Sequence, residues 1–339
     1  MSKNLLLATL GTSPAVVTEA VDLLREESIA ISGIHVFVTK DRDVWESFTL
    51  LAEHLPQHDG ITWIHPVEVG VYYDIDSTEA AVEFLALASQ QLKTLRDAGY
   101  RVYVSIAGGR KAMAALLALA VQFYGAERLF HIWVPPWLET EGEIDKLRNY
   151  RNWPEKLNEF LHPRLDMDPE DRPHLVTLPV IGLFPFMDDI RTALTGQAEP
   201  AREIRRLLRD YGLLAPDGKP TELGQRIAEV LESVEGLPPA RQAECQIHIA
   251  KHHYSDRLER FARQLCSRFP FITEIRSGEW GSGQAKVKIE APNVIRVFKP
   301  LGTDFPLQLI LTTTAKTAGE LEAARRNIEE FLFKNGFHS

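Results

Sequence analysis

The segment Leu-Leu-Leu-Ala-Thr-Leu at 5–10, followed by Gly-Thr-Ser-Pro at 11–14, decides how the first half of the chain folds. A continuous apolar run of this length is typical of a strand buried on both faces, and the glycine and proline that follow it end the strand. A helical stretch then runs from Val16 to Glu26. An apolar strand that turns directly into a helix predicts a β–α unit of a parallel sheet.

The same succession of strand and helix recurs through residues 1–195. Further strands are expected at 34–39, 101–106 and 128–134, and helices at 79–98 and 112–124. This alternation predicts an α/β domain of Rossmann-like type, in which helices cover both faces of a parallel sheet. Ligands bind beyond the carboxyl ends of the strands in such sheets. The loops after Leu10 and Ile106 are therefore the first places to look for a binding site.

Both loops have a composition that suits phosphate groups. Glycine lets the backbone approach a ligand closely, helix N-termini present N–H groups to an anion, and cations add charge-assisted hydrogen bonds. One loop alone is equally well explained as a tight turn, whereas the two together favour a phosphate-bearing ligand. No G-x-G-x-x-G follows a strand, so a dinucleotide is disfavoured, and neither a cofactor nor a metal is expected. The candidate ligand-binding residues are Gly11, Thr12, Ser13, Gly108, Gly109, Arg110 and Lys111.

The stretches at 6–19, 105–113 and 129–134 resemble the CRISPR-associated Rossmann-fold (CARF) sensors. The resemblance implies a homodimer that binds a cyclic oligoadenylate, usually the tetra-adenylate, across its two-fold axis. It also implies that the seven loop residues line the phosphates of the ring. Some relatives cleave their activator as well, and Ser13 and Lys111 would serve that reaction. The sequence does not separate binding of the ring from its cleavage.

Residues 196–240 read as a small domain of short helices. An amphipathic helix is expected at 200–211 and a second at 222–234, which Thr221 would cap after a glycine-containing turn. This pattern resembles a helix-turn-helix or winged helix. The segment from Arg202 to Glu235 contains six basic and seven acidic residues. It therefore has almost no net charge, which makes DNA an unlikely partner. Docking, toward a ribosomal protein for example, is favoured, and a CARF–winged-helix transcription regulator remains the non-enzyme alternative.

Residues 241–339 have an α+β pattern and a different charge balance. A helical region is expected at 243–268, strands at 285–289, 294–298 and 307–313, and a closing helix at 318–333. This part carries 15 Lys and Arg against 11 Asp and Glu, a net +4, whereas the other 240 residues carry 23 against 36, a net −13. The asymmetry suggests that the C-terminal part meets a polyanion.

Cleavage of RNA without a metal needs a base, cations around the phosphorus and an acid, which clustered lysines and arginines can supply. Lys286 and Lys288 share one strand face, although composition alone favours an ordinary solvated sheet surface as the explanation. The segments 284–298 and 307–316 resemble the RelE-type mRNA interferases, which cut mRNA in the ribosomal A site. The resemblance implies Lys286 and Lys288 as the paired catalytic lysines, Arg296 as the phosphate-binding arginine and Lys316 near the position of the acid. Where many relatives place a late tyrosine, this chain offers His338 or Lys334.

The two resemblances together imply a ribonuclease of type III CRISPR antiviral defence that a cyclic oligoadenylate activates. The rival effector is a HEPN ribonuclease acting on free RNA, for which Arg241 and His248 have the required spacing. HEPN domains are all-helical, so the strands expected after residue 278 favour the RelE alternative. Cys245 and Cys266 suggest neither a metal site nor a disulfide framework, and no segment has the apolar length of a membrane span. A cytoplasmic protein is expected.

Overall fold

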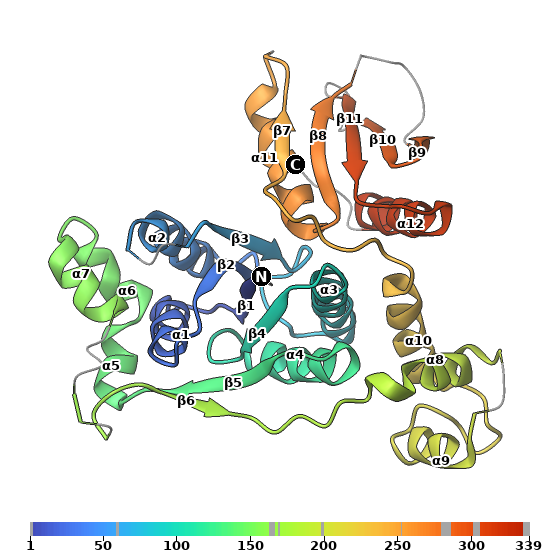
Figure 1. Cartoon of the computed structure of the whole chain (residues 1–339), viewed down its shortest axis with the longest axis horizontal. Coiled ribbons are helices and arrows are strands. Elements are labelled where there is room, and N and C mark those ends of the chain that lie inside the picture. The colour runs from blue at the N-terminus through green and yellow to red at the C-terminus, as the bar shows by residue number, and fades with distance from the viewer. Residues whose placement is uncertain are drawn as a thin grey trace. The chain divides into compact units, whose positions relative to one another are not determined.

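The computed structural model describes residues 3–58, 61–162, 167–168, 170–197, 200–251, 253–278, 286–300 and 306–334. The chain forms two compact units, coloured along the sequence in Figure 1. The first comprises Met1–Phe84 and Gly99–Ile181, and the second comprises Leu85–Ala98 and Gly182–Ser339. The long helix α3 (Thr78–Asp97) contributes residues to both units.

A six-stranded sheet forms the centre of the first unit. Its order is β3-β2-β1-β4-β5-β6, with all neighbours parallel except the antiparallel pair β5–β6. The strand order reverses at the adjacent strands β1 and β4, which makes their carboxyl ends the switch point of the sheet. The predicted parallel α/β fold is thereby confirmed. The strands are β1 (Asn4–Thr9), β2 (Ile31–Val38), β3 (Trp63–Glu68), β4 (Arg101–Ser105), β5 (Arg128–Trp133) and β6 (His174–Thr177).

Helices connect these strands in the order that the sequence indicates. The predicted helices at 16–26, 79–98 and 112–124 are present with ends within one residue. Sequence reasoning missed α2 and β3; β3 contains Pro66, a residue that argues against a strand and is tolerated here because β3 is an edge strand. Besides α3, the helices of this unit are α1 (Ala15–Glu26), α2 (Arg42–His58), α4 (Lys111–Tyr124), α5 (Pro136–Glu141), α6 (Ile144–Leu147), a 3-10 turn η1 (Arg148–Tyr150) and α7 (Pro154–Leu161).

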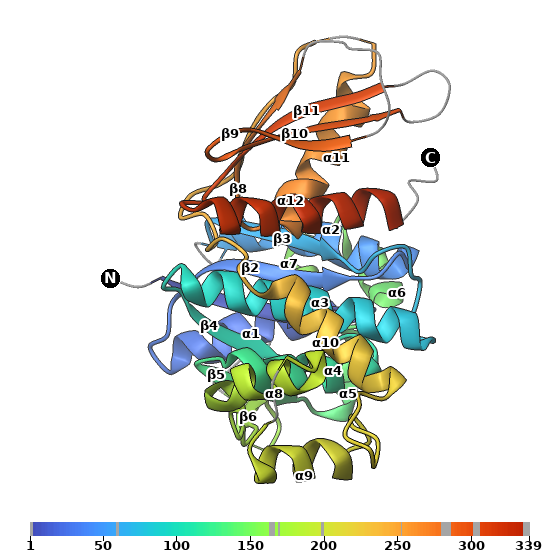
Figure 2. The same cartoon turned by 90° about the vertical axis from the view of Figure 1, so that its right-hand side faces the viewer.

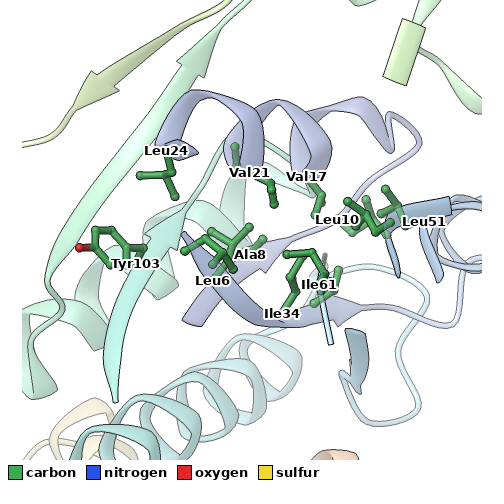
Figure 3. Packing of buried hydrophobic residues seen from close by; sticks show 14 of the residues in the cluster. Leu6, Ala8, Leu10, Val17, Val21, Leu24, Ile34, Leu51, Ile61 and Tyr103 are labelled. Carbon is green, nitrogen blue, oxygen red and sulfur yellow. The ribbon is translucent and has the colours of Figure 1, made fainter. Parts of the chain in front are cut away.

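The central strand β1 is buried on both faces. Alternate residues of the strand point to one side, and there Leu6 and Ala8 pack with Val21 and Leu24 of α1 in one apolar cluster (Figure 3). The intervening residues of β1 are equally buried. Burial of this extent holds β1 and α1 in a fixed relation, so the short loop between them is positioned by the core.

The second unit begins with three short helices. The hydroxyl of Thr221 accepts a hydrogen bond from the Gly224 N–H at 3.1 Å, which confirms the predicted cap. Leu214 and Pro220 form an antiparallel bridge across the turn between the last two helices. The predicted helices at 200–211 and 222–234 are present, while the winged-helix assignment stays a prediction. The helices are α8 (Met187–Thr195), which follows a 3-10 turn η2 (Phe184–Phe186), α9 (Arg202–Asp210) and α10 (Glu222–Val234).

The C-terminal part of this unit contains a five-stranded sheet with two helices (Figures 1 and 2). The order is β7-β8-β11-β10-β9, and all neighbours are antiparallel except β7 and β8. The strands expected at 285–289, 294–298 and 307–313 and the helix expected at 318–333 are all present. The elements are β7 (Gln246–His248), α11 (Ser255–Arg268), β8 (Ile272–Ser277), β9 (Lys286–Ala291), β10 (Val294–Pro300), β11 (Pro306–Thr313) and α12 (Ala318–Lys334).

The helix expected at 243–268 was wrong in its first half. Residues 246–248 form β7 instead, where Ile247 lies opposite Ile275 of β8, and α11 begins only at Ser255. The apolar residues Ile247 and Ile249 alternate with polar neighbours, and this period of two is the strand signal that the helical reading overlooked. Residues 243–254 also lack the apolar spacing of an amphipathic helix.

The expectation that the cysteines form no disulfide was also wrong. Cys245, just before β7, is bonded to Cys266 in the last turn of α11, with their Cα atoms 6.1 Å apart. A separation of 21 residues carries no signal of its own, because pairing depends on α11 returning beside the start of β7. Among the helices that the structure describes, none has the length and apolarity needed to cross a membrane.

Candidate functional site

A cavity of about 440 Å³ lies at the carboxyl ends of β1 and β4. The structure brings six of the seven candidate ligand-binding residues together around it, and its volume falls within the range of ordinary ligand pockets. The remaining candidate, Lys111, is an exposed first residue of α4 and does not line the cavity. The six lining candidates are Gly11, Thr12, Ser13, Gly108, Gly109 and Arg110.

Close approach of the two loops explains why they contain glycine. A Cβ atom on Gly108 would lie 2.5 Å from the carbonyl oxygen of Thr9 and 2.9 Å from a methyl carbon of Val16. The Thr9 hydroxyl donates a hydrogen bond of 2.6 Å to the Gly108 carbonyl. Gly109 has a φ of +78°, in the left-handed region that favours glycine. The glycines therefore both allow the turns and leave the backbone at the cavity uncovered.

Two helices start at the cavity. Ala15 and Val16, in the first turn of α1, line it directly, and α4 starts at Lys111 immediately after the second loop. For both helices, the N-cap residues Pro14 and Arg110 make no capping hydrogen bond through a side chain in the structure. The first N–H groups of a helix without such a cap carry a partial positive charge, which favours an anionic group at this position.

The polar side chains at the mouth of the cavity already have contacts within the protein. Arg110 is half exposed and lies 3.4 Å from both Asp41 and Asp74. The Ser13 hydroxyl donates to the Gly142 carbonyl at 3.2 Å. Exposed ion pairs of this kind contribute little free energy, so Arg110 can exchange its carboxylate partners for a phosphate.

Glu19 of α1 also lines the cavity and was missed by sequence reasoning. Its exposed fraction is 2%, and its Oε2 has no hydrogen-bond partner among the described residues. Burial, reinforced by the nearby Asp22 carboxylate, raises the pKa of Glu19 from 4.5 to about 8. No clear sequence signal indicated this role, because Asp22 and Glu26 follow Glu19 at helical spacing and make that side of α1 resemble a solvated face.

Three of the four candidate catalytic residues lie on the second unit's sheet. Arg296 of β10 pairs directly with Lys288 of β9, and the next residue of β9 on that face is Lys286. Both lysines are exposed, and Arg296 Nε lies 2.5 Å from Glu290 Oε1. The structure therefore brings these three cations together on one exposed face of the sheet, as expected from their spacing.

The same sheet face carries further basic side chains toward its other edge, and Glu274 lies among them, 3.6 Å from Arg276 and 3.8 Å from His248. Arg276 of β8 and Arg296 of β10 both pair with Ile310 of β11, so they flank it, and His248 of β7 pairs with Arg276. Sequence reasoning missed Arg276 because the strand β8 itself was not predicted. A row of basic side chains across several strands is a suitable surface for a nucleic acid backbone.

Lys316 is not brought to this cluster. It lies three residues beyond the end of β11, and it lines a different cavity, of about 590 Å³, together with Thr273 and Glu274. The other acids considered, His338 and the side chain of Lys334, lie outside the described residues. Arg241, the arginine of the HEPN alternative, is buried and donates to the carbonyls of Cys266, Pro270 and Ile272 at 2.9–3.3 Å. It has a structural role.

Comparison with known proteins identifies the family. The model of the family "CRISPR-associated protein NE0113" matches residues 13–213. The chain belongs to this family. The matched region of the NE0113 family includes Ser13, the whole second glycine loop and Glu19, and it extends through α9. Among curated proteins, no match was found.

Two solved structures show distant similarity to this NE0113-family chain. Csm6 of Enterococcus italicus, bound to cyclic hexa-2'-fluoro-hexa-dAMP, has 10% identity and a TM-score of 0.40 over 69% of this chain. The aligned part is 53% of that protein, so the chain spans about half the length of Csm6. Protein VC1899 of Vibrio cholerae has 11% identity and a TM-score of 0.31, covering 92% of this chain and 78% of its own.

Proposed function

We propose that this NE0113-family protein is a CARF-type sensor that binds cyclic tetra-adenylate and thereby activates a ribonuclease in its C-terminal part. The observation that carries the proposal is the cavity where two glycine loops and two helix N-termini converge, with Arg110 at its mouth. A small cyclic ligand with a phosphodiester at every nucleotide suits this arrangement. Membership of a CRISPR-associated family supports a nucleotide signal of that kind.

A homodimer is part of the proposal. A ring of identical nucleotides has rotational symmetry, and two copies of one cavity related by a two-fold axis can each bind an equivalent half of it. Binding switches on the effector only if the ring has higher affinity for the active arrangement than for the inactive one. We therefore expect one ring for every two chains.

The effector step is cleavage of mRNA in the ribosomal A site without a metal. The ribose 2′-oxygen attacks the adjacent phosphorus as a base removes its proton, and the 5′-oxygen leaves as it receives a proton from an acid. Lys286, Lys288 and Arg296 surround the phosphate with positive charge, which stabilises the crowded transition state. The neutral middle helices are assigned to docking, with a ribosomal protein as the proposed partner.

The test is a toeprint of ribosomes loaded with mRNA and incubated with the full chain, with and without cyclic tetra-adenylate. The wild type should produce a ring-dependent stop at the A site. Lys286→Ala plus Lys288→Ala should lower the cleavage rate by at least about 100-fold, in the range for general acid–base and electrostatic groups, while ring binding is unchanged. Arg260→Ala plus Arg263→Ala, which removes two exposed cations from α11, is the matched control and should cleave normally.

Cleavage by the double-lysine variant at the wild-type rate would refute the assignment of the active face. Cleavage of free RNA as efficiently as mRNA on ribosomes would refute the A-site proposal. The alternatives have less support. The HEPN ribonuclease needs Arg241, which is bound to three carbonyls. A transcription regulator needs a basic middle segment, and six basic residues there face seven acidic ones.

Cleavage of the activator by the same cavity is a weaker candidate. The two residues assigned to this reaction are not both available at the cavity. The Ser13 hydroxyl already donates to the Gly142 carbonyl, and Lys111 does not line the cavity. A ring incubated alone with the wild type, followed by chromatography, measures this activity directly. Linear products that Ser13→Ala cannot form would support it.

A further inference from the structure

The carboxyl group of Glu19 is a feature of the cavity that phosphate binding does not use. A carboxylate repels phosphate, so a residue selected only for anion binding would not be acidic at this place. Glu19 is nevertheless 2% exposed, lines the cavity from α1, and leaves Oε2 without a hydrogen-bond partner among the described residues. A buried polar atom without a partner is costly, and such an atom beside a ligand cavity points to a partner supplied by the ligand.

The protonation state of Glu19 decides what that partner can be. Burial keeps the pKa near 8, so at neutral pH the group is mainly the uncharged acid. An uncharged carboxyl donates one hydrogen bond through its O–H and accepts another at its carbonyl oxygen. It therefore presents the same donor and acceptor pair as the amide of glutamine, the side chain that reads adenine in nucleic acid complexes.

Adenine offers the complementary pattern. Its exocyclic N6 amino group donates, and the ring nitrogen beside that group accepts. The cavity also has an aromatic neighbour, since Trp133 of β5 lines it, stacks on His174 with ring centroids 5.0 Å apart, and remains 38% exposed.

We propose that Glu19 is the adenine-reading residue of the cavity, accepting from N6 and donating to the adjacent ring nitrogen of one adenine in each protomer. This inference rests on the proposed function and adds base recognition to it. The cavity then recognises both parts of an adenylate: helix N-termini and Arg110 bind the phosphate, and Glu19 selects the base. A guanidinium or ammonium group at this place would repel no phosphate but would have no acceptor for N6.

The experiment is calorimetric titration of the full chain with two rings: cyclic tetra-adenylate and its analogue with purine in place of adenine, which lacks only the exocyclic amino group. Glu19→Gln keeps the donor and acceptor pair, whereas Glu19→Met fills the same space without either. Glu26→Met is the matched control, because Glu26 is on the same helix but outside the cavity. The melting temperature of each variant shows whether it is folded. Glu19→Met removes an unpaired buried oxygen, so it should not lower the melting temperature.

The wild type should prefer the adenine ring over the purine ring by roughly 5- to 150-fold for each adenine read, the factor that one buried unpaired group produces. Glu19→Gln and Glu26→Met should keep that preference. Glu19→Met should lose it, with a tenfold or greater loss of affinity for cyclic tetra-adenylate.

Equal affinity of the wild type and Glu19→Met for cyclic tetra-adenylate would overturn the inference while leaving the proposed function intact. A second outcome would also overturn the inference. If the wild type cleaved the ring and Glu19→Gln bound the ring without cleaving it, Glu19 would be a general base. Absence of heat for the wild type with either ring would refute the proposed function, and with it the inference.

Discussion

Replacing Glu19 with glutamine should change how the stability of the protein depends on pH. The folded chain holds the pKa of this carboxyl at about 8, against 4.5 for the unfolded group. Between these values the folded state keeps a proton that the unfolded state has released, so the free energy of unfolding falls as pH rises. The stability that the protonated group contributes is fully present below pH 4.5 and is lost as pH rises to about 8.

The magnitude follows from the size of the pKa shift. Each pH unit between the two pKa values costs about 1.4 kcal/mol, so the wild type should lose roughly 3 kcal/mol between pH 5 and 7.5 through this group alone. Glu19→Gln does not titrate and should not show this loss. For a unit of this size, 3 kcal/mol corresponds to a shift of the melting temperature of about 6–12 °C.

The assay is urea unfolding of both proteins at pH 5 and 7.5, followed by circular dichroism. The variant removes only one titrating group, so the contributions of the others cancel to first order in the difference between the two proteins. The charged or titratable groups nearest to Glu19 or around its cavity are Asp22 on α1, Arg110 after β4, His131 on β5, and Glu139 and Glu143 beyond it. The free energy of unfolding of the variant minus that of the wild type is compared at the two pH values. If this difference changed by less than about 0.5 kcal/mol from pH 5 to 7.5, Glu19 would be ionised in the folded protein and the reasoning would fail.

Three further changes test the fold around the site. Gly108→Ala places a Cβ 2.5 Å from the Thr9 carbonyl oxygen and should lower the free energy of unfolding in urea by about 1–3 kcal/mol. Gly319→Ala is the control: its Cβ would meet nothing closer than 3.9 Å, so it should change that free energy by less than about 0.5 kcal/mol. Thr221→Ala removes the cap of α10 and should cost about 1 kcal/mol, which equal stability of the two proteins would contradict. Reduction of Cys245–Cys266 opens a loop of 21 residues and should cost about 3 kcal/mol; mass spectrometry that finds two free thiols in the oxidised protein would contradict the bond.

Much of the first unit could be predicted because its signals are local. Leu5 to Leu10 is apolar throughout, and only a strand with helices on both faces buries such a run. The glycine loops follow directly from the ends of β1 and β4, so the position of the cavity followed from the topology. Glu19 could not be assigned in the same way, because its role depends on α1 turning that residue toward the cavity instead of toward solvent.

The second unit was harder to predict because its pairing is not local. β7 is three residues long, and only its register with β8 shows that His248 and Arg276 share a face with Arg296. The disulfide has the same origin, since Cys245 meets Cys266 only after α11 has returned along the sheet. Lys316 was placed by resemblance with the strand register unknown, and the structure puts it three residues beyond the end of β11, where it lines another cavity.

The central claim is that one ring of adenylates binds between two copies of the cavity at β1 and β4. Calorimetric titration of the purified full chain with cyclic tetra-adenylate tests it most directly. We expect saturable heat at one ring per two chains, which is retained in Lys286→Ala plus Lys288→Ala and strongly reduced when Arg110→Glu is combined with Lys111→Glu. No heat with cyclic tetra-adenylate, or binding that survives the reversal of charge at those two residues, would contradict it.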